Sequence, residues 1–267
     1  MKLLLTFLLT GLSICGICQD TMRTYFDAFW RATVEEDASY YRKMYKNAQN
    51  LWVVNDYYLD GQLQMQGQFS NPKTEKKTGH FTYFYPNGAK QSEGEYTEGY
   101  KSGHWRSWFT SKALDGEGDY LRDKKTGTWV WYHKNGQISA RETYSYDKLK
   151  EFEYFDEAGV KSTVSSIDAN TMPEFPGGVK EYLKWIQTAV SYPETARIRG
   201  LSGIVNVSFT VKKDGSIADV TVENPVHPLL HAEAIRVIKS MPNWRPGKDH
   251  NRSFEIIEKA PIQFKLE

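Results

Sequence analysis

The residues whose types could do chemistry are few and scattered. His227 and His231 stand four apart with Glu233 nearby, a spacing that would put two metal ligands on one helix face. Pro228, however, is typical of a helix start, so His227 is predicted to cap that helix or to lie in the loop before it. We therefore predict no metal site and no cofactor.

Catalytic motifs are absent from the sequence that follows Cys18. It contains no nucleophile elbow, phosphate-binding loop, zinc-protease helix or Cys-x-x-Cys pair. Gly177-Gly178 follows no strand and is interpreted as the entry turn of a helix rather than an anion site. Nothing pairs Asp214 with Asp219 as an acid and a base. The chain is predicted not to be an enzyme, with no catalytic residue.

Composition favours protein or glycan partners over nucleic acid. The 267 residues carry 34 basic and 33 acidic side chains, a net charge of +1 that gives no electrostatic attraction for nucleic acid or acidic lipid. Aromatic residues are abundant, with 8 Trp, 17 Tyr and 13 Phe, yet the mean hydropathy is −0.61. This interleaving of aromatic and polar residues favours strands over membrane helices.

The amino terminus has the pattern of a secretory signal. Lys2 precedes an apolar run from Leu3 to Cys18. As a helix this run would be about 24 Å long at about 1.5 Å per residue, short of the roughly 30 Å hydrocarbon core. We predict a signal peptide at 1–18, cleaved near Cys18, and an exported protein. An uncleaved inner-membrane anchor and lipidation of Cys15 or Cys18 are the alternatives.

A 24-residue repeat organises the middle of the chain. Gly79, Gly103 and Gly127 recur at this spacing. The same register relates Gly94, Gly118 and Glu142 and three aromatic rows: Phe81, Trp105, Trp129 and Phe152; Phe84, Trp108, Tyr132 and Phe155; Phe69, Tyr96, Tyr120 and Tyr144. Each unit is interpreted as two short strands joined by a Gly-containing turn, with too few apolar residues to fold alone, so units must stack. The pattern Asn-Gly, Gly-Glu-Tyr, Gly-x-Trp resembles the MORN-repeat variant of bacterial proteins.

The aromatic rows allow two interpretations. They form either the core of a single-layer sheet, which we favour, or a face that binds a glycan or an extended peptide. In the first case Trp105 and Trp129 occupy equivalent, largely buried positions on successive hairpins. Residues 20–60 are predicted to be mostly strand, the repeat domain to span 19–160, and the polar segment 161–171 to be a linker.

Residues 172–267 show a different order of elements. Val179, Leu183, Ile186 and Val190 predict the apolar face of a helix that Pro193 ends. The pattern then predicts a strand at 205–211, a turn at 214–215, a return strand at 218–222, a helix from Pro228 to about 241 with its apolar face at Leu230, Ala234, Val237, Ile238 and Met241, and a final strand at 254–266. Pro261 cannot donate to a ladder, so the final strand should lie at a sheet edge.

This order and its spaced residues resemble the C-terminal domain of the TonB energy-transducer family. The residues that carry the resemblance are Phe175-Pro176-Gly177-Gly178, Trp185-Ile186, Tyr192-Pro193, Ala196, Gly200, Gly203, Val205, Val207, Phe209, Val211, Asp214-Gly215, Glu233-Ala234, Met241-Pro242, Trp244, Pro246-Gly247, Pro261-Ile262 and Phe264. The predicted fold class is α+β. It comprises an all-β repeat sheet of stacked hairpins and a TonB-like domain with two helices and a three-stranded antiparallel sheet.

The resemblance implies a protein of the periplasm or outer membrane whose C-terminal domain adds an extended segment of an outer-membrane TonB-dependent transporter to its sheet. It implies partner-binding residues Tyr192, Pro193, Ile262, Gln263, Phe264, Lys265 and Leu266. Because Pro261 cannot donate, the free main-chain donors of this edge are expected to cluster at Ile262 to Leu266. Ala189, Val190 and Ser191 replace the glutamines that better-known members carry. The alternative is a surface scaffold whose repeat aromatics bind a glycan or another envelope protein, without energy transduction.

Overall fold

The computed structural model describes residues 22–266, so the predicted signal peptide lies outside the described residues. The chain forms two compact units, Met1–Trp105 and Arg106–Glu267. Between residues 22 and 266, none of the helices has the length and apolar character needed to span a membrane. The assignment of 19–160, 161–171 and 172–267 to a repeat domain, a linker and a C-terminal domain stays a prediction.

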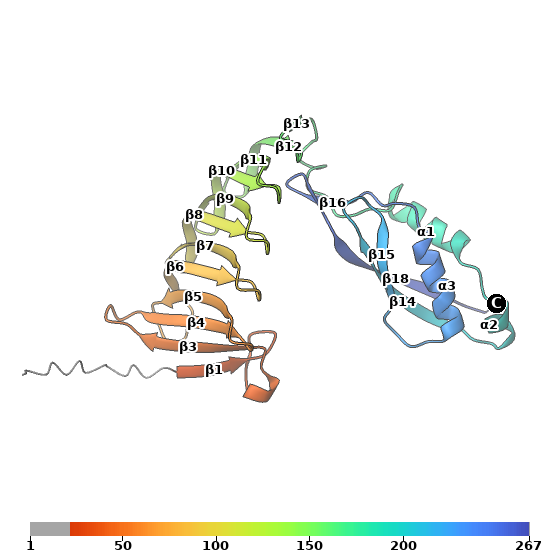
Figure 1. The fold of residues 1–267 in the computed structure, drawn as a ribbon, viewed down its shortest axis with the longest axis horizontal. Coiled ribbons are helices and arrows are strands. Elements are labelled where there is room, and N and C mark those ends of the chain that lie inside the picture. Colours follow the sequence, from red (N-terminus) through yellow and green to blue (C-terminus); the bar gives the residue numbers. More distant parts are fainter. Residues whose placement is uncertain (1–21, 267) are drawn as a thin grey trace, which may run out of the picture. The chain divides into compact units, whose positions relative to one another are not determined.

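A long antiparallel sheet contains the first thirteen strands, which confirms the predicted all-β repeat sheet (Figure 1). From β3 onward the strand order follows the sequence, and β1 lies between β3 and β2. The elements are β1 (Met22–Phe26), β2 (Ala32–Thr33), the 3-10 helix η1 (Glu35–Asp37), β3 (Tyr40–Lys46), β4 (Trp52–Tyr58), β5 (Leu63–Phe69), β6 (Lys77–Phe84), β7 (Lys90–Thr97), β8 (Tyr100–Trp108), β9 (Leu114–Leu121), β10 (Lys124–Tyr132), β11 (Ile138–Ser145), β12 (Lys148–Phe155) and β13 (Lys161–Ser162).

Aromatic rings cover glycines of the neighbouring strand in the first unit. A Cβ atom on Gly67 would come within 2.2 Å of the Phe81 ring, and one on Gly94 within 2.4 Å of the Trp105 ring. The Trp105 indole Nε1 donates to the Glu95 carbonyl at 3.2 Å. Each ring therefore occupies the space that a side chain on the adjacent strand would need, and the sheet buries aromatic area without a second layer.

The same arrangement recurs in the second unit. A Cβ atom on Gly118 would come within 2.3 Å of the Trp129 ring, whose Nε1 donates to the Asp119 carbonyl at 3.1 Å. Trp105 and Trp129 are 3% and 4% exposed. This confirms that they occupy equivalent buried positions and that these rings belong to the core of the sheet.

Phe152 corrects the predicted register of the last repeat. Its ring is 43% exposed, whereas Tyr154, two residues later, is buried. The reason is Glu142, which stands at the position that Gly118 holds one repeat earlier and is fully buried. A strand that carries a side chain there leaves no space for a ring, so Phe152 lies outside the core.

The C-terminal part of the second unit has a three-stranded antiparallel sheet with helices, as predicted (Figure 1). The strand order is β15-β14-β18, and a separate two-stranded ribbon pairs β16 with β17. The elements are α1 (Gly178–Ala189), α2 (Glu194–Ile198), β14 (Gly203–Val211), β15 (Ile217–Val222), α3 (Pro228–Lys239), β16 (Gly247–Asp249), β17 (Arg252–Phe254) and β18 (Ile256–Phe264).

Helix α3 supplies the helical side of the core. It begins at Pro228, whose missing N–H costs nothing in the first turn, and its predicted apolar face is buried. The core cluster joins that face to alternate residues of β14 and β18: Leu230, Ala234, Val237, Ile238 and Met241 against Val205, Val207, Phe209, Val211, Ala260, Ile262 and Phe264. Full burial of each large aliphatic side chain contributes about 1.5–3 kcal/mol before the entropic cost is subtracted.

Helix α1 corrects half of its predicted apolar face, since Ile186 and Val190 pack against the core cluster as expected but Val179 and Leu183 do not. Val179 and Leu183 are 73% and 54% exposed, whereas Tyr182 and Trp185 pack against the core cluster. The centroid of the Phe175 ring lies 5.6 Å from that of the Tyr182 ring and 5.8 Å from that of the Trp185 ring. Aromatic side chains bury more area than Val or Leu, so the helix turns its aromatic side inward.

A third helix also differs from the prediction of two. Helix α1 ends at Ala189, before Pro193, and Pro193 precedes the short helix α2 as its N-cap. Proline is compatible with the entrance of a helix because the missing N–H would have no intrahelical partner there. The sequence pattern treated Pro193 only as a stop.

Candidate functional site

Strand β18 is an edge strand, as Pro261 predicted. It pairs with β14 on one side, and the described sheet continues no further on the other. Pro261 lies opposite Asn206, and the pairing runs without a break from Gly203 opposite Phe264 to Val211 opposite Ile256. The edge is therefore a regular strand along its whole length.

The direction of each main-chain group on β18 follows from its partner on β14. Asn206 N–H donates to the Asn224 side chain at 2.7 Å, and the Asn206 carbonyl accepts from Glu223 N–H at 2.9 Å, so both groups point toward β15. Antiparallel residues alternate between bonded and non-bonded pairs, which makes Asn206 and Pro261 a non-bonded pair. Pro261 and its alternate neighbours thus turn their main chain toward the open edge.

Three N–H groups consequently face the open edge: those of Ile257, Lys259 and Gln263. The predicted cluster of donors from Ile262 onward is corrected by this alternation. Ile262 and Phe264 are directly opposite Val205 and Gly203, so their main-chain groups belong to the ladder with β14. Pro261 leaves a gap between the outward donors of Lys259 and Gln263.

The remaining predicted binding residues have different surroundings. Ile262 and Phe264 are buried on the core face, Gln263 and Lys265 are exposed, and Leu266 is half-buried. The Tyr192 ring contacts the Phe264 ring at 5.7 Å and an interplanar angle of 84°, and its hydroxyl donates to the Leu201 carbonyl. Tyr192 thus supports the end of β18 from the core side, while Pro193 caps α2.

An apolar hollow near β18 was missed by sequence reasoning. Its volume is about 260 Å³, and it is lined by Pro173, Glu174, Phe175, Val179, Tyr182, Leu183, Phe209, Trp244, Glu258 and Lys259. The Trp244 indole Nε1 is buried there without a hydrogen-bond partner. Burial, and then the charge of Glu258, raise the pKa of Tyr182, so this phenol stays neutral. The sequence pattern assigned Val179 and Leu183 to the buried face of α1, so it did not predict that they line an exposed hollow.

The candidate metal ligands have other partners. His227 is the N-cap of α3, as predicted, and its Nδ1 accepts from Leu229 N–H at 3.2 Å. His231 Nε2 accepts from Val226 N–H at 2.9 Å, and Glu233 binds Arg236 at 2.7 Å. Both imidazole lone pairs are thus used within the fold. Among residues 22–266 no group of three His, Cys, Asp or Glu side chains has the arrangement of a metal site.

Comparison with known proteins supports the resemblances drawn from the residues. Residues 188–266 match the family described as the Gram-negative bacterial TonB protein C-terminal, and residues 77–98 and 125–146 match the MORN repeat variant. The TonB proteins of two Helicobacter pylori strains, J99 and 26695, are each 38% identical to this chain over 96 residues. The match covers 34% of this chain and 33% and 32% of those proteins.

The solved structures that resemble this chain include the C-terminal domain of Helicobacter pylori TonB. One solution structure is 31% identical, covers 33% of this chain and 92% of that domain, and has a TM-score of 0.27. A second is 33% identical over 34% of this chain and 87% of the other, with a TM-score of 0.26. The chain spans about a third of the length of the curated relatives it matches. The matched segments are thus similar to the TonB C-terminal family over residues 188–266 and to the MORN repeat variant over residues 77–98 and 125–146.

Proposed function

We propose that this chain is a periplasm-facing, non-enzymatic TonB-like protein that binds an extended segment of an outer-membrane transporter by strand addition. In this proposal the binding serves energy-coupled transport across the outer membrane. The segment 1–18 acts as a signal peptide that directs export and is cleaved near Cys18. The observation that carries the proposal is the open edge of β18, together with the match of residues 188–266 to the TonB C-terminal family.

The alternation along β18 supports a specific mode of pairing. An incoming extended segment would accept hydrogen bonds from the N–H groups of Ile257, Lys259 and Gln263. Opposite Pro261 the segment can donate to a carbonyl but receives no hydrogen bond in return. The buried side chains of Ile262 and Phe264 hold the strand against the core while its other edge is engaged.

A competing explanation for the same edge is protection against aggregation. Pro261 and the exposed lysines Lys259 and Lys265 are the devices by which natural edge strands avoid pairing with other chains. Lys259 also forms an ion pair with Glu223 at 2.7 Å, which keeps its charge beside the strand. Only a binding experiment separates an edge that is closed to all strands from one that selects a partner.

The test is titration of the full chain with extended peptides from the amino-terminal segments of outer-membrane transporters, followed by backbone amide NMR. We expect shifts at Ile257, Lys259 and Gln263. The substitution Gln263→Pro removes one outward donor and should weaken binding about fivefold, since a hydrogen bond is worth about 1 kcal/mol.

Two matched variants control that result. Gln263→Ala removes the side chain and keeps the donor, so it should bind like the parent. Ile262→Pro removes a donor that faces β14 and should destabilise the domain instead. Shifts confined to a helix face, or no binding at millimolar peptide, would overturn strand addition.

A further inference from the structure

Glu142 is the one position where the repeat replaces its core glycine with an acid. Gly94 and Gly118 precede it at the 24-residue spacing, and an aromatic ring covers each of them. The Glu142 side chain is fully buried. Burying a carboxylate is costly unless its oxygens are hydrogen-bonded, so the replacement requires compensating donors.

The last repeats supply three of these donors. Trp131 Nε1 and the Tyr144 hydroxyl donate to Glu142 Oε2 at 3.1 and 2.6 Å, and the Tyr154 hydroxyl donates to Oε1 at 2.8 Å. We call Glu142 with Trp131, Tyr144 and Tyr154 the Glu142 socket. A fourth contact comes from outside the repeats, because His250 Nδ1 lies 2.7 Å from Oε2. The buried Nδ1 makes no well-aligned hydrogen bond, so this contact is one of close approach between the imidazole and the carboxylate.

His250 lies at the tip of the hairpin formed by β16 and β17. Asp249 pairs with Arg252, so the connection has two residues, His250 and Asn251, with φ angles of 49° and 62°. Positive φ at both positions is the geometry of a type I′ turn, for which His is an unusual residue. The strained backbone at His250 places its imidazole at the tip of the hairpin.

The hairpin tip contacts the last repeat strands at several points. The His250 ring stacks on Trp131 with centroids 3.8 Å apart and planes 11° apart. The Arg252 guanidinium forms an ion pair with Asp115 and donates to the Tyr132 carbonyl at 3.0 Å.

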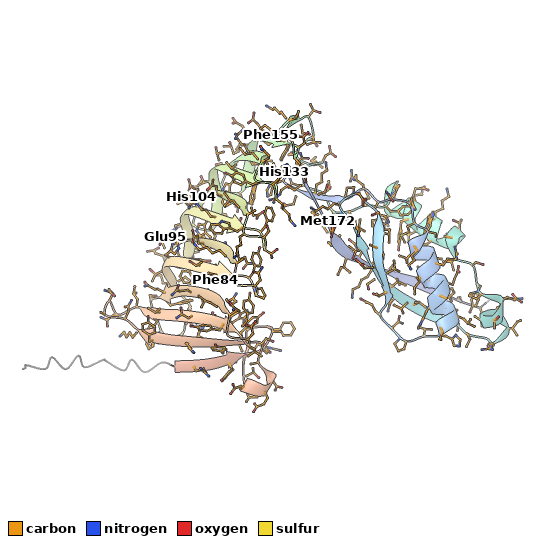
Figure 2. The ribbon with its side chains drawn as sticks, viewed as in Figure 1. Phe84, Glu95, His104, His133, Phe155 and Met172 are labelled. Atoms are coloured by element: carbon orange, nitrogen blue, oxygen red, sulfur yellow. The ribbon has the colours of Figure 1, made fainter. Side chains whose placement is uncertain are left out.

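The polar contacts continue to the end of β12. Asn251 Nδ2 donates to the Phe155 carbonyl at 3.1 Å, and His133 Nε2 lies 3.0 Å from the same oxygen (Figure 2 labels His133 and Phe155). On its other side the hairpin is held by residues 169–170, because Asn251 N–H donates to the Ala169 carbonyl at 2.9 Å and His250 N–H to the Asn170 side chain at 3.0 Å.

We propose that the Glu142 socket holds the β16–β17 hairpin, so that the C-terminal sheet is docked on the last repeat strands rather than tethered to them. Only Glu255 separates β17 from the edge strand β18. A pulling force applied to β18 would therefore be transmitted through Glu255 to the β16–β17 hairpin, and from the hairpin to the last repeat strands. This inference concerns the chain's own assembly and holds whether or not β18 binds a transporter.

The experiment measures the distance between spin labels in the full chain, with Cys15 and Cys18 changed to Ser and single labels at Lys150→Cys on β12 and Lys239→Cys on α3. Both positions are exposed. The parent should give a narrow distance distribution. The substitution Glu142→Gly restores the repeat's glycine and so preserves the sheet, and it should abolish the narrow component. His250→Ala should abolish it as well.

The matched control is Glu151→Gln, which removes an exposed carboxylate from β12. It should keep the narrow distribution. Hydrogen exchange of β10 and α3 in the same samples shows that each variant is folded. If Glu142→Gly does not fold, His250→Ala decides the result because its side chain lies outside the repeats. A narrow distribution in the folded His250→Ala chain would overturn the proposal.

Discussion

The repeat sheet and the C-terminal sheet bury their apolar faces in different ways. In the repeats, the Trp129 ring fills the space over Gly118 on the next strand, so one sheet provides both sides of its core. In the C-terminal sheet, Val207 and Ile262 face a helix that carries Leu230. The first design requires glycine at fixed positions in central strands, where glycine is otherwise unfavourable. The second allows ordinary β-formers on every strand and presents one regular open edge.

The largest expected difference concerns how much of the chain is destabilised when a core side chain is removed. Trp129→Ala should cost about 3–5 kcal/mol and Leu230→Ala about 2–5 kcal/mol. Because each repeat contacts only its neighbours, Trp129→Ala should lower hydrogen-exchange protection in β9 to β12 and leave α3 protected. Leu230→Ala should do the reverse. Equal loss of protection in both regions by either variant would show that they unfold as one unit.

The second prediction concerns acid stability, which should depend on the repeats. Burial alone would raise the pKa of Glu142, but the contacts with His250, Tyr144 and Tyr154 outweigh it and lower the pKa from 4.5 to about 2. Lys125 also faces this carboxylate, and burial lowers the pKa of Lys125. A lowered carboxyl pKa contributes stability that is complete above pH 4.5 and is lost as the pH falls toward 2. The contribution is on the order of 3 kcal/mol.

Urea unfolding followed by Trp fluorescence between about pH 5 and about pH 2 measures this effect. Glu142→Gln should flatten the pH dependence of the repeat transition. Among the described residues of 172–266, the buried polar side chains are Ser208 and His250, neither of them an acid, so the C-terminal transition should change less. An unchanged pH profile in Glu142→Gln would remove Glu142 as the cause.

The third prediction compares a methyl group added to the repeat sheet with a methyl group removed from the C-terminal sheet. Gly118→Ala places a Cβ atom 2.3 Å from Trp129 and should cost about 1–3 kcal/mol by overpacking. Ala260→Gly in β18 removes a Cβ atom from a helix-covered sheet and should cost about 0.5–1 kcal/mol. Chemical denaturation of both variants gives the two values. A neutral Gly118→Ala would mean that the indole moves freely, and that the glycine row is not required.

The smallest effect belongs to the side-chain cap at the start of helix α3. His227→Ala removes the acceptor for Leu229 N–H and should lower stability by about 1 kcal/mol, within the usual range for caps. His80→Ala on β6 is the matched control, because that imidazole is exposed and its contact with Glu95 is a surface one. Thermal denaturation should separate the two, and equal melting temperatures would argue against the capping role.

The sequence by itself determined the features that depend on periodicity and local backbone chemistry. The 24-residue spacing identified Trp105 and Trp129 as equivalent core positions, Pro228 identified the start of α3, and Pro261 identified an edge strand. These conclusions hold because a strand, a turn or a helix start is set by residues a few positions apart. A missing N–H has the same consequence in any tertiary setting.

The tertiary structure decided which side of each element meets a partner. It exposed Val179 and Leu183, since Tyr182 and Trp185 bury more area against the core. It selected the outward donors of β18 through the hydrogen bonds that Asn206 on β14 makes with Glu223 and Asn224, just after β15. No pattern within β18 contains this information.

It also brought His250 to Glu142, residues far apart in the chain. The sequence marked Glu142 as a departure from the glycine row, but it gave no indication of what would compensate a buried charge. That compensation depends on which distant donors the fold places within hydrogen-bonding distance, and periodicity does not record such contacts.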